Sequence, residues 1–83
     1  MPFAGHAAMQ RYLNRNGDSG VVAYELGPAS IAVRFVDGSV YLYDARRPGA
    51  QQVDDMKRLA QAGRGLSGYI SRCVQQNFAK KLR

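Results

Sequence analysis

The chain is poor in the residues that many metal sites and enzymes use. Its 83 residues include one cysteine, Cys73, and one histidine, His6. A single thiol excludes an internal disulfide, which favours a cytoplasmic location. No run is long and apolar enough to cross a bilayer, and residues 1–10 lack the basic and apolar blocks of a signal peptide. We therefore expect a cytoplasmic protein without a membrane partner.

Catalytic groups are equally scarce. His6 has no cysteine or carboxylate beside it, which is typical of an incidental exposed histidine. Asp54 and Asp55 are neighbours on an expected helix, where adjacent side chains do not face each other as an acid–base pair must. The GxGxxG letters of residues 63–68 follow a helix, whereas a dinucleotide site needs a preceding strand. The sequence predicts no enzyme activity, no cofactor, no metal site and no small-molecule substrate.

Positive charge gathers in the second half of the chain. Residues 46–83 hold nine Lys and Arg against two Asp, whereas residues 16–45 hold one Arg against four acidic residues. The net charge is +6. This asymmetry points to an anionic partner such as nucleic acid, an acidic protein or a membrane surface. A solvated basic face that serves solubility is the simpler alternative.

The clearest structural signal is the stretch 31–43, two β-prone runs joined by Asp37-Gly38. Asp-Gly favours a two-residue type I′ hairpin turn. The register that follows pairs Val36 with Ser39, Phe35 with Val40, Arg34 with Tyr41, and Val33 with Leu42. Alternation then assigns a core face to Ile31, Val33, Phe35, Val40 and Leu42, and an outer face to Ala32, Arg34, Tyr41 and Tyr43.

We expect an α+β fold built around this hairpin. Its elements are a short N-terminal helix within residues 6–15, an antiparallel meander of strands 20–26, 30–36 and 39–44, and two helices, 51–62 and 66–79, packed on one sheet face. Residues 1–18 form an extension, 19–79 the domain and 80–83 a basic tail. The second helix should bury Ile70 and Val74 against the hairpin, with Cys73 as a small core residue.

Several motifs resemble the KTSC domain, a small module found alone or at the end of some lysyl-tRNA synthetases. They are Gly-Val-Val-Ala-Tyr-Glu at 20–25, Tyr-x-Tyr at 41–43, Pro48, and Gly-x-x-Leu-Ser-x-x-Ile at 63–70. Gly65, Leu66 and Ser67 stand where that family has Tyr, Phe and Asn. The resemblance implies a three-stranded meander with C-terminal helices, no established enzymatic activity, and a weak link to RNA.

A second resemblance is in topology alone. Helix, three strands and helix is also the order in double-stranded RNA-binding domains, which place lysines at the start of the last helix. Only Arg64 lies at that place here.

A nucleic-acid site can be predicted from these features. On the outer sheet face, Arg34, Tyr41 and Tyr43 would stack bases. Phosphates of RNA or DNA would meet basic side chains of the loop and helices, namely Arg46, Arg47, Arg64 and Arg72. The alternative is a protein-interaction or self-association module that uses the same outer face or the open edge of the third strand.

Overall fold

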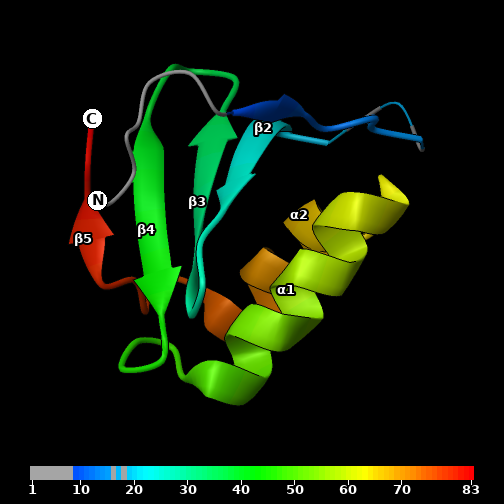
Figure 1. The fold of residues 1–83 in the computed structure, drawn as a ribbon. Helices are drawn as coiled ribbons and strands as arrows, with labels where there is room; N and C mark the ends of the chain where they lie inside the picture. Colours follow the sequence, from blue (N-terminus) through cyan, green and yellow to red (C-terminus); the bar gives the residue numbers. More distant parts are fainter. Residues whose placement is uncertain (1–8, 16, 18) are drawn as a thin grey trace.

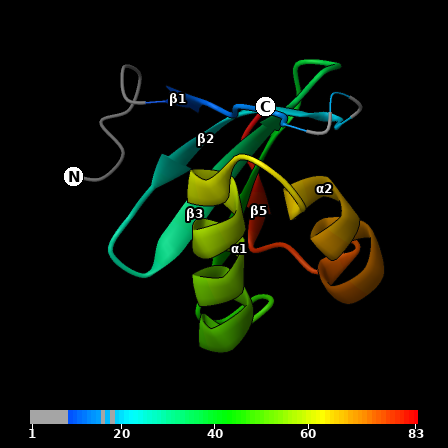
Figure 2. The ribbon, with the colours of Figure 1, turned by 90° about the vertical axis from the view of Figure 1, so that its right-hand side faces the viewer.

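The protein is built on a central hairpin, β3 (Ser30–Phe35) and β4 (Val40–Asp44), within a five-stranded antiparallel sheet. The computed structural model describes residues 9–15, 17 and 19–83 (Figure 1). The sheet order is β1-β2-β3-β4-β5, with β1 (Gln10–Arg11) and β2 (Val21–Leu26) on one side of the hairpin and β5 (Lys80–Lys81) on the other. Both helical segments cover one face of this sheet (Figures 1 and 2).

The expected N-terminal helix and three-stranded meander are wrong. Residues 6–8 of that helix lie outside the described residues, and β1 occupies the part that follows, pairing with β2. The cause is tertiary packing. Tyr12 is 3% exposed in the core, and its hydroxyl oxygen accepts a hydrogen bond from the Leu66 N–H (3.2 Å). A short helix has little intrinsic stability, so the burial of Tyr12 outweighs the local preference for a helix.

The hairpin register differs by one residue from the expected one. Val33 pairs with Tyr41 and Ile31 with Tyr43. The loop has three residues, 36–38, because the Phe35 N–H donates to the Ser39 carbonyl (2.9 Å). Only Gly38 has a positive φ there, +90°, as in a type I turn followed by a glycine bulge. A slip of one residue turns every side chain of β4 to the other face.

The core lies between the sheet and the helices. α1 (Ala50–Ala62) buries Val53, Met56 and Ala60. It ends at Gly63, whose left-handed φ of +79° lets its N–H reach carbonyls of the last turn. The Arg15 side chain donates to the Ala62 carbonyl there (2.8 Å), which fixes the segment after β1 on the end of α1. No helix in the described part of the chain has the length and hydropathy needed to span a membrane.

The last helix is shorter than expected. α2 (Leu66–Tyr69) continues into a π-helical turn, η1 (Ile70–Val74), and Gln75 with its positive φ of +53° ends it. Ile70 and Val74 join the core cluster that includes Val33, but Cys73 is exposed, so its predicted core position is wrong. A π-turn closes its backbone hydrogen bonds over five residues instead of four.

The segment after η1 then returns to the sheet. Lys80 and Lys81, expected in a tail, form β5 on the edge of β4. The Ala79 N–H donates to the Leu42 carbonyl (2.8 Å) and the Leu82 N–H to the Val40 carbonyl (2.7 Å). The edge of the hairpin that was expected to be open is therefore paired.

Candidate functional site

The predicted aromatic face does not exist on the outer side of the sheet. Arg34 is exposed there, but Tyr41 and Tyr43 point to the helix side because of the register. Tyr43 is 2% exposed, and burial, with a smaller effect of the neighbouring Tyr41, raises the pKa of its hydroxyl to about 12. Tyr41 is half-buried against Phe35 and Phe78. Base stacking on Arg34, Tyr41 and Tyr43 as one outer surface is excluded.

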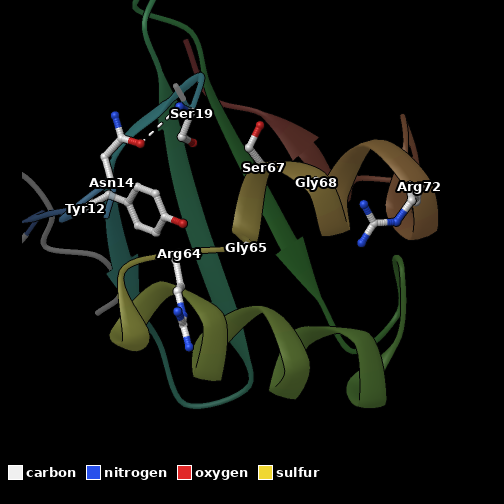
Figure 3. Close-up of a pocket in the computed structure, with 8 residues that line it drawn as sticks. All are labelled: Tyr12, Asn14, Ser19, Arg64, Gly65, Ser67, Gly68 and Arg72. Atoms are coloured by element: carbon white, nitrogen blue, oxygen red, sulfur yellow. Dashed lines mark hydrogen bonds between the residues drawn. The ribbon is translucent and has the colours of Figure 1, made fainter. Parts of the chain in front are cut away.

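Arg64 and Arg72, by contrast, line one pocket, which we call the arginine pocket (Figure 3). It encloses about 370 Å³ between the segment before β2 and the start of α2. Its lining is polar apart from one ring, and consists of Tyr12, Asn14, Ser19, Arg64, Gly65, Ser67, Gly68 and Arg72. Hydroxyl, amide and guanidinium groups thus share one hollow, as an anionic ligand requires.

The side chains of the two arginines of this pocket have different orientations. The Arg72 guanidinium lies back over Gly68, where a Cβ would come within 3.1 Å of its Nη1 atom. Figure 3 shows Arg64 extending away from Asn14 and Ser19. Asn14 accepts a hydrogen bond from the Ser19 N–H (3.0 Å), which joins the wall opposite Arg72. The Arg72 guanidinium thus lies over Gly68 of the pocket lining, whereas Arg64 points away from Asn14 and Ser19.

Arg46 and Arg47 line a second basic hollow, the loop pocket, with Lys80. It encloses about 460 Å³ beside the loop that follows β4. The Asp44 carboxylate accepts the backbone N–H groups of Arg46 (2.9 Å) and Arg47 (3.0 Å), so it shapes the loop. Neither guanidinium forms an ion pair with a carboxylate of the described residues. Lys80 reaches this site through the β5 pairing, which periodicity along the chain could not reveal.

Most of the positive charge of the described residues is uncompensated. Their one ion pair joins Arg58 to Asp55. Two further cations are engaged with carbonyl oxygens, Arg15 with Ala62 and Lys57 with Gly27. The remaining nine are exposed and make no side-chain hydrogen bond to a described residue: Arg11, Arg34, Arg46, Arg47, Arg64, Arg72, Lys80, Lys81 and Arg83.

The acidic groups mostly serve the fold. Asp37 accepts hydrogen bonds from the Ser39 hydroxyl (2.6 Å) and N–H (2.9 Å) in the hairpin loop. These bonds favour the carboxylate and lower the pKa of Asp37. The Asp55 carboxylate forms an ion pair with the Arg58 guanidinium and accepts a hydrogen bond from the Tyr69 hydroxyl (2.9 Å). Carboxylates held in this way neutralise little of the basic surface.

The described residues contain no group of side chains that suits a metal ion and no loop that suits a dinucleotide. Within residues 9–15, 17 and 19–83, no three His, Cys, Asp or Glu side chains gather where they could hold a metal ion. His6 lies outside the described residues. Gly63 ends α1, Gly65 precedes α2 and Gly68 lies within α2, and a helix rather than a strand leads into them, so Gly63 and Gly65 belong to an interhelical turn.

Neither a protein-family model, nor a curated protein, nor a solved structure matches this chain. The resemblance to the KTSC domain stays a prediction. The function has to be inferred from the sites themselves.

Proposed function

We propose that this protein is a small, cytoplasmic, non-enzymatic module that binds nucleic acid, with RNA preferred, through its phosphate backbone. The observation that carries the proposal is the set of nine exposed cations that form no ion pair and no side-chain hydrogen bond with the described residues. Seven of them are arginines, whose planar guanidinium matches phosphate oxygens in pairs. An exposed thiol at Cys73 suits a reducing compartment.

The arginine pocket and the loop pocket are the two phosphate sites of this proposal. Each combines cationic side chains with a concave surface that a flat basic face would lack. In the arginine pocket, Ser67 and Asn14 add uncharged groups that bond phosphate oxygens or a ribose 2′-hydroxyl. Contacts of this kind position a backbone and carry no base sequence.

Self-association through the sheet edge is less well supported than nucleic-acid binding. The outermost strands, β1 and β5, are two residues long and contain Arg11, Lys80 and Lys81. Short edges with positive charges discourage pairing between copies. Large apolar side chains that are exposed among the described residues, such as Leu13 and Val36, are few and lie in separate segments.

The test is a titration of the full chain with labelled single-stranded and double-stranded RNA at about 50 mM and about 200 mM salt. We expect affinity to fall steeply with salt, because each neutralised phosphate adds about 0.7–0.9 to the slope of log K against log salt. Arg64→Ala with Arg72→Ala should reduce that slope by about 1–2. Arg46→Ala with Arg47→Ala should do the same for the loop pocket.

Arg58→Ala is the matched control. It removes one positive charge from an exposed residue that is already paired with Asp55. If the pockets bind phosphates, this variant changes the slope less than Arg72→Ala does. Absence of binding to any RNA or DNA by the wild-type protein at low salt overturns the proposal and favours the protein-interaction alternative.

A further inference from the structure

A third pocket, of a different character, lies between the tip of the hairpin and the turn after η1. It encloses about 490 Å³. Four of its lining residues are aromatic, Phe35, Tyr41, Tyr43 and Phe78, and its polar lining residues are Asp37, Ser39, Gln75 and Gln76. We call it the aromatic pocket. The charge pattern of the sequence does not reveal it, because its aromatic residues come from β3, β4 and the segment after η1.

One polar group of this pocket has no hydrogen-bond partner among the described residues. Tyr43 is 2% exposed, yet its hydroxyl makes no hydrogen bond to any described residue. Every fully buried polar side-chain atom in the described part of the chain does have a partner. Tyr43 is one of the residues that line the aromatic pocket. A buried hydroxyl in this position offers a hydrogen bond to a ligand.

The rings are arranged to receive a flat, apolar body. Tyr41 meets Phe78 at a centroid distance of 4.6 Å and an angle of 61°, and Phe35 at 5.8 Å and 77°. These edge-to-face contacts hold the rings in place without covering them, since Phe35, Tyr41 and Phe78 are all only half-buried. Planar heterocycles stack on or against such rings with little regard to their identity.

Charged groups of both signs lie at the aromatic pocket, because Asp37 lines it and the Lys81 ammonium lies near the ring of Tyr41, another lining residue. Ser19 of the arginine pocket is next in the chain to Gly20 of the aromatic pocket, and Arg72 follows Ile70 on the same helical segment. The Lys81 ammonium lies 5.8 Å from the centroid of the Tyr41 ring. An aromatic cavity close to cationic groups suits a nucleotide within a strand, whose base is flanked by two backbone phosphates.

We infer that the aromatic pocket receives one unstacked base of a single-stranded RNA whose neighbouring phosphates contact Arg72 and Lys81. The inference rests on the proposed function and adds to it a preference for single strands. The Tyr43 hydroxyl bonds the edge of the base, and the exposed amides of Gln75 and Gln76 lie at the rim to bond the same edge or the ribose. A paired base in a duplex cannot enter.

The test compares two probes of equal length and charge, a short oligoadenylate and the same phosphate backbone without bases. We expect the oligoadenylate to bind roughly 5- to 150-fold more tightly, the range typical of one stacked base. Equal affinities overturn the inference and leave phosphate binding intact. If neither probe binds at low salt, the proposed function fails as well, so the two failures are distinct.

Two variants locate the base. Tyr43→Phe removes only the hydroxyl, and Phe78→Leu removes a ring while keeping an apolar side chain. We expect the first to reduce the advantage of the oligoadenylate roughly 2- to 10-fold and both to leave the affinity for the abasic backbone unchanged. Tyr24→Phe is the control, because its buried hydroxyl lies near Gln10 (3.4 Å), outside the pocket.

Thermal melting of each variant separates loss of the pocket from loss of the fold. A base-dependent advantage that persists in Tyr43→Phe and Phe78→Leu overturns the inference, as does an equal loss in Tyr24→Phe at unchanged melting temperature.

Discussion

The register of the central hairpin predicts opposite outcomes for two neighbouring substitutions, Tyr43→Ala and Leu42→Ala. Tyr43 lies in the core at 2% exposure, whereas Leu42 is half-buried on the other face. In the register expected from the Asp37-Gly38 turn, Leu42 would lie in the core and Tyr43 outside. The two variants therefore report directly which face of β4 meets the helices.

The magnitude follows from the buried area. A buried tyrosine removes about 150–250 Å² from water, which at about 25 cal/mol per Å² corresponds to about 4–6 kcal/mol. This is an upper value, because the unfolded chain already buries part of that surface. We expect Tyr43→Ala to lower the free energy of unfolding by about 3–5 kcal/mol, and Leu42→Ala to lower it by about 1–2 kcal/mol because Leu42 is only half-buried. A stability of about 5–15 kcal/mol makes the first loss severe.

The measurement is urea unfolding followed by circular dichroism, with the free energy taken from midpoint and slope. Tyr43→Phe serves as the control, because it keeps the volume and should retain most of the stability. If Leu42→Ala proved more damaging than Tyr43→Ala, the register, and with it the aromatic pocket, would be refuted.

Further predictions concern the loop, the last helix and alkaline pH. Gly38→Val should lower the free energy of unfolding by about 1–2 kcal/mol, and Gly38→Asn by less. A Cβ at Gly38 meets no atom within 4 Å, so the penalty comes from the positive backbone φ of +90°. Equal melting temperatures of the two variants would contradict this. Ile70→Ala should cost about 2–5 kcal/mol in urea unfolding, and a neutral effect would mean that η1 is not packed on the sheet. Burial raises the pKa of Tyr43 and Tyr69 from 10.0 to about 12, with the Asp55 carboxylate adding to the effect at Tyr69. The unfolded chain then ionises first, so stability should fall as pH rises from about 10 towards 12, and less steeply in Tyr43→Phe.

Local signals in the sequence were most reliable where the chain must turn or where one residue type dominates. The hairpin at Asp37-Gly38 exists, and Gly63 and Gly65 separate two helices. The turn type was not predictable from Asp-Gly alone, because the same dipeptide suits a two-residue turn and the three-residue loop with a bulge that forms here. One additional residue in the loop moved both tyrosines from the expected outer surface to the helix side of the sheet.

In the candidate sites too, some features follow from the sequence and others depend on the tertiary structure. The basic character of residues 46–83 is a property of composition, and Arg46, Arg47, Arg64 and Arg72 were predicted as phosphate contacts from their place in the expected loop and helices. Their grouping into two pockets depends on β5 and on the segment before β2, which bring Lys80, Asn14 and Ser19 to them from distant parts of the chain.

The sequence by itself determined the hairpin's place, the apolar stripe of α1 and the surplus of positive charge, because these follow from nearest neighbours and periodicity. Only the tertiary structure decided the face of β4, the two edge strands and the end of the last helix at Gln75. Strands of two residues have no local signal, and they form because β2 and β4 offer unpaired backbone groups. The aromatic pocket exists for the same reason: the return of the chain to β4 after Val74 places Phe78 against Tyr41.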